Sequence, residues 1–348
     1  MLYKNVNIEC ISYELPPEAV TSEEIEQQLS TVYERLKLPP GRLELMTGIR
    51  ERRLWKPGTM PSAAAAMAGA NALAASKIAK SDLGCLINCS VCRDFLEPAT
   101  ATVVHQKLGF PETAVAFDIS NACLGVLTGM TLVAGMIEAG HIKAGMLVAG
   151  ENSRPLLETT IRTILGDKTI TRQSIKPFFA SLTIGSGAVA VILCRRDLSS
   201  HDHRLLGATS LSVTQYNDLC RGNADKGMGD NHDTLMNTDS EKLMHCGVAA
   251  AAETWNLFLQ ETGLKRNDFA CFCTHQVGSA HRKLLYEKLQ IDIGRDYPTL
   301  DRFGNTGSVS CPLTAALAID NGVVANGSTM ALMGIGSGIN CAMLGIKW

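Results

Sequence analysis

The amino-acid sequence predicts an α/β fold built from two similar halves. Short runs of β-preferring residues alternate with longer segments of helical periodicity, which is the pattern of a largely parallel sheet covered by helices. When the sequence is shifted by 182 residues, Cys123 falls on Asn305 and Gly125 falls on Gly307. Each half then consists of a strand, a tight turn, a long helix and another strand, which predicts an internal duplication.

A second repeat locates an insertion in the first half. Residues 184–187 (Ile-Gly-Ser-Gly) recur at 335–338, which is 151 residues later instead of 182. The difference of 31 residues predicts an extra segment between about residues 151 and 182. We therefore expect an N-terminal half over residues 1–195, which carries the insertion, and a C-terminal half over residues 196–348.

Local signals place the first elements of the chain. Residues 3–13 alternate enough in polarity to form a strand, and Thr21-Ser22-Glu23-Glu24 is a capping box that begins a helix. Residues 47–55 are rich in arginine and predict a turn or hairpin. Pro61 is suited to the first turn of a helix, and an alanine-rich helix is expected from there to about residue 80.

The following elements lead to a cysteine. Residues 83–91 predict an apolar strand, and 97–98 (Glu-Pro) predict the start of another helix. The β-preferring run 114–119 leads to Cys123, and the apolar periodicity of 124–137 predicts a buried helix after it. At a helix N-terminus, free N–H groups and the helix dipole favour a thiolate, the form that attacks carbonyl groups. A buried core cysteine is the alternative interpretation.

Two residues of the second half complete the candidate site. Residues 270–274 predict a strand that ends at His275, and strand ends are where sites assemble in α/β sheets. Asn305 occupies the turn that repeats the Cys123 turn, so a pseudo-twofold relation would bring both turns to one cavity beside His275. A thiolate can take an acyl group, and an imidazole and an amide can stabilise an oxyanion or enolate. The three residues therefore predict thioester chemistry.

Composition narrows the class of protein. The net charge of −2 argues against a nucleic-acid partner, and no apolar run reaches the length of a membrane span. Twelve cysteines without a secretion signal indicate a reducing, cytoplasmic location. Cys85, Cys89 and Cys92 have the spacing of an iron–sulfur loop, but they fall in an apolar strand and no metal is expected. The polar residues 196–245 predict a linker and surface loops.

The chain resembles the thiolase superfamily, in its 3-oxoacyl-[acyl-carrier-protein] synthase III branch, from end to end. The matching features are the Cys–His–Asn set, the turn at 47–50, the strand at 185–188 and the loop at 336–338. The resemblance implies a thiolase fold, in which duplicated βαβαβαββ halves form a five-layered α-β-α-β-α core. It also implies a homodimer, and an oxyanion hole formed by the backbone N–H groups of Cys123 and Ser337.

Within this branch the chain is most similar to the OleA group, whose members join two fatty acyl-CoAs head to head. The similar segments are 93–98, 151–154, 174–177 and 275–277. The sequence His-Gln-Val-Gly from residue 275 departs from the His-Gln-Ala-Asn that is typical of the carrier-protein-dependent synthases. The resemblance implies that Glu97 of the partner subunit removes an α-proton. A condensation of two plain acyl-CoAs needs such a base, whereas a decarboxylation does not.

The expected activity is a non-decarboxylative Claisen condensation through an acyl-Cys123 intermediate, which gives a 2-alkyl-3-keto acid or its thioester. Acyl-CoA is the substrate, no cofactor is expected, and enzymes of lipid or olefin biosynthesis would receive the product. Arg50, Arg52 and Trp55 are candidates for contact with the CoA nucleotide through ion pairing and stacking. The insertion at 151–182 is expected to line an alkyl channel.

Three alternatives stay open at this stage. A synthase that extends an acyl primer with malonyl-[acyl-carrier-protein] would release CO₂ and would tolerate Glu97→Gln. An enzyme that transfers an acyl group to an alcohol or amine would share the acyl-Cys123 step but would form no carbanion. A degenerate homologue that acts as a binding subunit would form no acyl adduct.

Overall fold

The computed structural model describes residues 1–222 and 236–348. Nine of its strands are hydrogen-bonded in the order β11-β12-β13-β8-β1-β7-β6-β4-β5. Their bounds are β1 (Val6–Glu14), β4 (Leu83–Asn88), β5 (Val115–Asp118), β6 (Ala144–Glu151), β7 (Gly187–Arg195), β8 (Arg204–Ser212), β11 (Phe269–Thr274), β12 (Thr329–Gly336) and β13 (Asn340–Lys347).

The same series of strand pairings occurs twice in this sheet. In the N-terminal part β1, β7 and β6 are antiparallel neighbours, and β4 and β5 then add in parallel. In the C-terminal part β8, β13 and β12 are antiparallel neighbours, and β11 adds in parallel. A parallel bridge between Phe272 and Asp296 stands where the second part would have its counterpart of β5. The predicted duplicated α/β fold is therefore confirmed.

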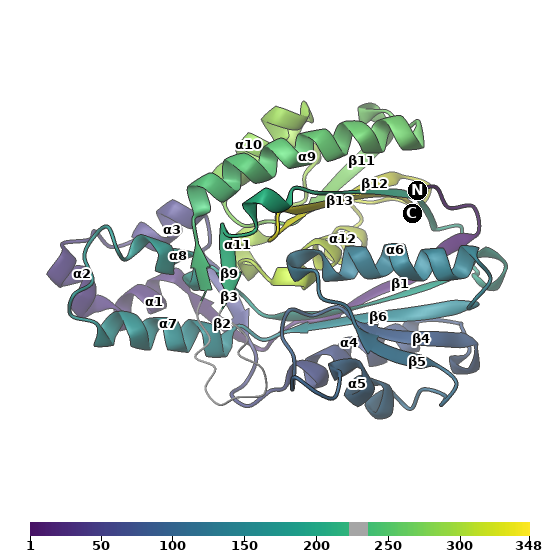
Figure 1. The fold of residues 1–348 in the computed structure, drawn as a ribbon, viewed down its shortest axis with the longest axis horizontal. Helices are drawn as coiled ribbons and strands as arrows, with labels where there is room; N and C mark the ends of the chain where they lie inside the picture. The colour runs from purple at the N-terminus through teal and green to yellow at the C-terminus, as the bar shows by residue number, and fades with distance from the viewer. Residues whose placement is uncertain (223–235) are drawn as a thin grey trace.

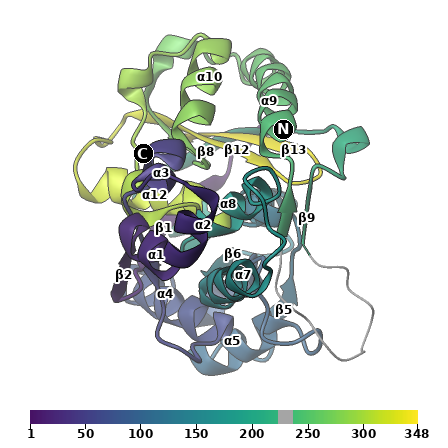
Figure 2. The same ribbon diagram turned by 90° about the vertical axis from the view of Figure 1, so that its left-hand side faces the viewer.

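Helices form three further layers around the two parts of the sheet, as Figures 1 and 2 show. The central helices α6 (Gly125–Glu138) and α12 (Ser310–Asp320) lie between the two parts. The outer face of the N-terminal part carries α4 (Pro61–Ala75) and α5 (Thr100–Leu108). The outer face of the C-terminal part carries the other pair, α9 (Ser240–Thr262) and α10 (Ser279–Leu289).

The central helices are apolar on nearly all sides because sheet covers both of their faces. Every residue of α12 from Ser310 to Ala318 is buried, and a single buried cluster joins Leu127 of α6, Val191 of β7 and Leu332 of β12. A helix that is apolar all round is the type that a core between two layers requires. Because α6 and α12 both begin in this core, the turns that precede them meet at the middle of the molecule.

The capping box, the helix that begins at Pro61 and the strand in the arginine-rich segment are all present near the N-terminus. Helix α1 (Ser22–Gln28) is capped by Thr21, whose Oγ1 accepts from Glu24 N at 3.0 Å, while the Glu24 carboxylate accepts from Thr21 N at 2.6 Å. Pro61 occupies the first turn of α4, but this helix ends at Ala75, about five residues earlier than expected. The arginine-rich segment contains β3 (Glu51–Leu54), which pairs antiparallel with β2 (Glu18–Thr21).

The insertion forms a side lobe that is visible at the left of Figure 1. Its helices α7 (Arg154–Gly166) and α8 (Lys176–Leu182) pack against α1, α2 (Ser30–Leu36) and α3 (Arg42–Thr47). Leu157, Ile161 and Ile164 of α7 are buried in the cluster that holds this lobe together.

The prediction of a linker over residues 196–245 was wrong. Strand β8 lies in the middle of the large sheet, and its Leu205 and Ala208 are buried in the central core. Two short strands, β9 (Cys220–Gly222) and β10 (Met236–Thr238), pair antiparallel beside the cavity described below, and α9 begins at Ser240. The segment was predicted to be a linker because the residues that flank these strands are polar and dominate its composition. Residues 223–235 of the same segment lie outside the part that the structure describes.

Two global properties bear on function. All twelve cysteines are free thiols. Among the described residues no helix has both the length and the apolar character needed to cross a membrane.

Candidate active site

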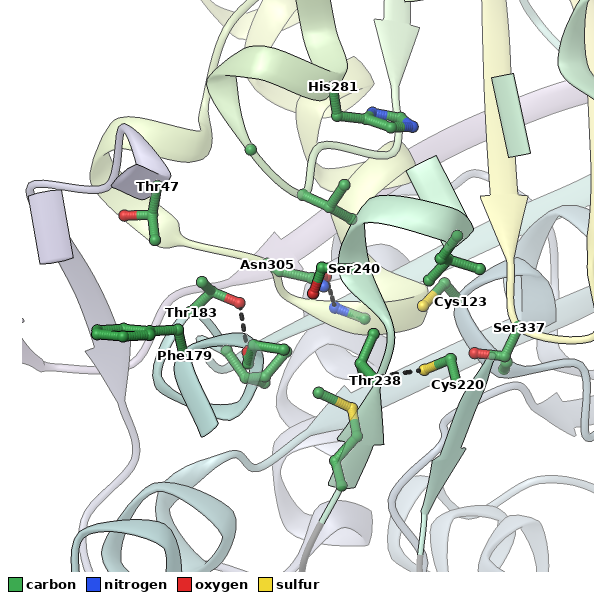
Figure 3. A pocket seen from close by; sticks show the side chains of 18 of the residues that line it. Thr47, Cys123, Phe179, Thr183, Cys220, Thr238, Ser240, His281, Asn305 and Ser337 are labelled. Atoms are coloured by element: carbon green, nitrogen blue, oxygen red, sulfur yellow. Dashed lines mark hydrogen bonds between the residues drawn. The ribbon is translucent and has the colours of Figure 1, made fainter. Parts of the chain in front are cut away.

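A cavity of about 1040 Å³ opens between the side lobe and the two central turns. Its wall contains Cys123, His275 and Asn305, so the structure brings together the three residues that the sequence predicts for thioester chemistry. Figure 3 shows Asn305 and Cys123 near the centre of this wall and Ser337 close to Cys123. The volume is at the upper end of the range for small-molecule sites, so a substrate with long chains can be accommodated.

Cys123 is held in a tight turn in front of α6. It lies in the 3₁₀ turn Ala122–Leu124, and the preceding Ala122 has a left-handed backbone with φ of +45°. This conformation is uncommon for a residue with a side chain and is typical of turns that present a functional group. Gly125 completes the turn, because a Cβ at this position would lie 2.0 Å from the carbonyl oxygen of Cys89. The turn therefore holds Cys123 against the end of β4.

The resting state of Cys123 differs from the thiolate that its place before a helix predicts. Burial, followed by the nearby Glu151 carboxylate and the Cys220 thiol, raises the pKa of the Cys123 thiol to about 12. Desolvation disfavours the charged form, and here it outweighs the favourable field of the helix N-terminus. Cys123 is therefore a neutral thiol before substrate binds, and its proton must leave during the reaction.

His275 and Asn305 form a hydrogen-bonded pair across the two C-terminal turns. His275 follows β11, and its Nε2 lies 3.1 Å from Oδ1 of Asn305. The same Oδ1 accepts a hydrogen bond from Gly307 N at 3.0 Å. Because Oδ1 is engaged on both sides, the Nδ2 group of Asn305 is the part of the amide that is left to meet a ligand.

The imidazole of His275 is neutral in this environment. Burial lowers its pKa below the ordinary value of histidine, although hydrogen bonds to Asn305 and to the backbone of Ile335 act in the opposite direction. A neutral imidazole can donate one proton and accept another, which suits both proton transfer and hydrogen bonding to a carbonyl oxygen.

The C-terminal loop packs against the turn that carries Cys123. A Cβ at Gly336 would lie 3.7 Å from Cys123 N, so Ser337 begins its loop directly beside this turn. Asn340 fastens the two segments, since its Nδ2 lies 3.1 Å from Asn121 Oδ1 and 3.3 Å from Ser337 O. Ser337 also lines the cavity. This placement is compatible with the oxyanion hole that the resemblance implies.

Glu151 is a functional candidate that sequence reasoning did not single out. It ends β6, it is 4% exposed, and it lines the cavity. Its carboxylate accepts from Val91 N at 2.8 Å, Cys92 N at 3.1 Å, and Ser308 N and Oγ at 3.3 and 2.5 Å. The carboxylate thereby links the loop after β4 to the turn that carries Asn305. Its position in a segment shared with the OleA group was the one available signal.

Glu97 lies outside the cavity of its own subunit. It is exposed, and it belongs to the loop between β4 and α5. Two earlier residues of this loop, Val91 and Cys92, do line the cavity. The loop also exposes large apolar side chains, with Val91 54%, Phe95 52% and Leu96 46% exposed.

The three residues predicted to contact a nucleotide do not form one surface. Arg52 is fully buried and donates to Val20 O and to Ser22 Oγ, and burial lowers the pKa of its guanidinium to about 10. Trp55 is 3% exposed, and its Nε1 donates to Glu151 O at 3.0 Å. Neither lines the cavity, and Arg52 points inward because alternate residues of β3 are buried. Arg50 is exposed at the start of this segment.

The insertion contributes the apolar side of the cavity. Leu156, Pro177, Phe179 and Ala180 line it, whereas the neighbouring Leu157 is buried in the lobe. The cavity wall also includes two residues that the sequence did not indicate, Cys220 of β9 and His281 of α10, both labelled in Figure 3. Among the described residues, no three His, Cys, Asp or Glu side chains are placed to hold a metal ion.

The fold and the site define a thiolase-fold enzyme with a cysteine, a histidine and an asparagine in one cavity. The family model of the 3-oxoacyl-[acyl-carrier-protein] synthase III C-terminal region matches residues 259–348, and that of 3-oxoacyl-[acyl-carrier-protein] synthase III matches residues 117–169. The chain is 41% identical to the acyl-CoA:acyl-CoA alkyltransferase of Shewanella oneidensis and 34% identical to that of Xanthomonas campestris, with 100% of both chains covered in each case. The chain therefore belongs to the acyl-CoA:acyl-CoA alkyltransferase family of acyltransferases, within the synthase III group.

Solved structures agree with this assignment. A Xanthomonas campestris OleA structure covers 100% of both chains with a TM-score of 0.93 at 33% identity. The solved OleA variants include replacements of a histidine, a glutamate and a cysteine. The beta-ketoacyl-[acyl-carrier-protein] synthase III of Koribacter versatilis is more distant, at 24% identity over 99% of this chain and 98% of its own.

Proposed function

We propose that this enzyme condenses two acyl-CoA thioesters head to head, without decarboxylation, through an acyl-Cys123 intermediate. The product is a 2-alkyl-3-keto thioester or the acid formed from it by hydrolysis. Support comes from the placement of Cys123, His275 and Asn305 on one cavity wall. The two relatives that match over their full length are acyl-CoA:acyl-CoA alkyltransferases, which also supports the proposal.

In the first step the sulfur of Cys123 attacks the thioester carbon of one acyl-CoA. A carbon–sulfur bond to the enzyme forms, the bond to CoA breaks, and CoA leaves as a thiol. His275 takes the proton of the Cys123 thiol and passes it to the departing sulfur, a role that suits its neutral imidazole. The N–H groups of Cys123 and Ser337 hold the negative oxygen that develops on the carbonyl.

In the second step another acyl-CoA enters, and His275 and Asn305 Nδ2 hold its thioester carbonyl. Glu97 of the neighbouring subunit removes one α-proton, and the carbanion attacks the acyl carbon on Cys123. The bond from carbon to Cys123 sulfur breaks, and the proton held by Glu97 returns to that sulfur. Atoms balance without an oxidant or a metal, and one CoA stays on the product.

A homodimer would supply Glu97 to the partner's cavity. The loop of Glu97 exposes Val91, Phe95 and Leu96, and β5 next to it is an edge strand whose Val115 is 51% exposed. Exposed apolar groups beside an open sheet edge are the features that a dimer contact covers. Twelve free thiols favour a reducing compartment such as the cytoplasm. Enzymes of lipid or olefin biosynthesis are the natural consumers of a 2-alkyl-3-keto product.

The observation that carries the proposal is the pairing of His275 and Asn305 on the wall that also presents Cys123. The test is incubation of the purified enzyme with one long-chain acyl-CoA alone, followed by mass spectrometry of the extracted lipid. We expect a product with the carbon skeleton of two acyl chains and release of free CoA thiol. A requirement for malonyl-[acyl-carrier-protein], with CO₂ release, would instead establish the extending synthase. Transfer of one acyl chain to an added alcohol or amine would instead establish an acyltransferase that forms no carbon–carbon bond.

A further inference from the structure

A second histidine lines the active-site cavity and has no part in the reaction described above. His281 is the third residue of α10, it is 8% exposed, and it belongs to the wall of the cavity. Among the described residues its ring has no hydrogen-bonding partner, and burial and His275 are the influences that act on its ionisation. An imidazole on a cavity wall without a protein partner can give a hydrogen bond to a ligand or receive one from it.

The charge of His281 restricts what that ligand can be. Burial, followed by the proximity of His275, lowers its pKa to about 4. The ring is therefore uncharged at neutral pH, with one N–H donor and one acceptor nitrogen. An uncharged ring offers no ion pair to a phosphate group. It matches a neutral group that itself has a donor and an acceptor, and a secondary amide is such a group.

The cavity wall next to His281 includes small residues. Gly278 and Ala280 belong to the same wall, and Thr47 of α3 lies on it as well. A Cβ at Gly48 would lie 3.0 Å from Ser279 Cβ, so the end of α3 closes against the start of α10. Large apolar side chains line the cavity from the insertion (Leu156 and Phe179) and also from α3 and α9 (Met46, Leu243 and Met244). The small residues at the start of α10 leave room for an unbranched arm beside His281, and alkyl chains can lie against the insertion.

We propose that His281 hydrogen-bonds the amide nearest to the sulfur in the arm of the acyl-CoA thioester. The reacting carbonyl must lie within reach of Cys123 and of the His275–Asn305 pair, with the substrate sulfur bonded to that carbon. In CoA two methylene groups separate this sulfur from the first amide, so this amide must lie close to the reacting carbonyl and inside the cavity. Figure 3 shows His281 projecting from α10 above Asn305 and Cys123 in that view.

This inference rests on the proposed use of acyl-CoA, but it concerns the acylation step and can be tested apart from condensation. The probes are two thioesters of the same fatty acid: the N-acetylcysteamine thioester, which keeps the first amide, and the 1-pentanethiol thioester, which replaces that amide by methylenes. The measurement is kcat/KM for thiol release by the full-length wild-type enzyme, His281→Phe and His281→Gln. Phe keeps the bulk without hydrogen bonds, and Gln keeps a donor and an acceptor.

The expected result is a loss of about tenfold in kcat/KM for His281→Phe with the amide thioester, and less than twofold with the pentanethiol thioester. His281→Gln should regain most of the loss. An equal loss on both thioesters would mean a packing role and would overturn the proposal. Equal kcat/KM values of the wild-type enzyme for the two thioesters would also overturn the proposal. This comparison does not depend on whether a variant folds. The proposed function fails separately, if the lipid product made from acyl-CoA is not the doubled skeleton.

Discussion

Nε2 of His275 and Oδ1 of Asn305 lie 3.1 Å apart, although the residues belong to different turns at the ends of β11 and α11 (Leu300–Phe303). The contact fixes the orientation of both side chains, because Gly307 N also donates to the amide oxygen. The imidazole and Nδ2 can then hold one carbonyl oxygen together. Loss of Asn305 should therefore impair carbanion formation more than acylation of Cys123, whereas loss of His275 should impair both steps, because His275 also takes the proton of the Cys123 thiol.

Cys123→Ala should abolish the acyl adduct. The purified variant incubated with acyl-CoA should show no gain in mass, whereas wild-type enzyme should gain one acyl group. Cys246→Ala is the matched control, since Cys246 is also a half-buried free thiol but does not line the cavity. An acyl adduct on Cys220 in the Cys123→Ala variant would contradict the assignment of the nucleophile.

Glu97→Gln should separate the two steps. The variant should still acquire the acyl group on Cys123, but the rate of condensation should fall by about 100-fold or more because the base is lost. The measurement is the ratio of adduct to condensed product in one reaction. Equal condensation rates in the variant and the wild type would point to a carbanion that forms by decarboxylation.

The source of Glu97 can be determined with mixed dimers. Dimers that pair a Cys123→Ala subunit with a Glu97→Gln subunit contain one complete site only if Glu97 acts across the interface. After random mixing, about half of the dimers are mixed, so about a quarter of wild-type activity should return. No recovery, in a sample where mass spectrometry shows the mixed dimers, would place Glu97 in its own subunit's site.

Glu151→Gln should affect both stability and the reactivity of Cys123. An amide that replaces the carboxylate brings an NH₂ group against N–H and O–H donors, so we expect a loss of about 2–3 kcal/mol in the free energy of unfolding. Because Glu151 raises the pKa of Cys123, its removal should lower that pKa and increase the rate of alkylation by iodoacetamide at pH 8. Glu158→Gln, at an exposed position of α7, is the control. An alkylation rate that is unchanged in Glu151→Gln would contradict an influence of Glu151 on Cys123.

The free energy of unfolding should decrease as the pH is lowered from about 6.5 to about 4, because His281 is protonated in the unfolded chain before it is protonated in the folded protein. Its pKa is about 4 in the folded protein and near the ordinary 6.5 when unfolded, so between these values the unfolded chain binds the extra proton. The contribution is complete above pH 6.5 and is lost as the pH falls towards 4, by about 3 kcal/mol in total. Denaturant titrations at pH 7.5 and 5 should show a smaller pH effect for His281→Gln than for the wild type. An identical pH effect would mean that His281 titrates normally.

Cys123, His275 and Asn305 could be predicted from the sequence because each one lies next to an element that the sequence pattern predicts. Cys123 stands between a β-preferring run and an apolar helix, His275 ends a strand, and Asn305 falls on Cys123 in the internal repeat. These are properties of the chain itself, and the turns before α6 and α12 converge because both helices form the central layer.

Other features depended on which way a side chain points, which the sequence did not reveal. The arginine-rich segment was predicted to be a turn or hairpin, yet Arg52 faces the core because it alternates with the half-buried Glu51 and Arg53 in β3. Glu151 and His281 acquire their roles from contacts with segments distant in the sequence. Strand β8 was not predicted because the polar residues around it dominate the local composition.

The most direct test of the account follows the fate of the acyl group on Cys123. The enzyme is loaded with a tetradecanoyl group, freed of excess acyl-CoA, and then mixed with hexadecanoyl-CoA alone. We predict a single-turnover product that contains both complete chains, with loss of the adduct at the same rate. An adduct that persists until a malonyl thioester is added, and then gains two carbons with release of CO₂, would contradict this prediction.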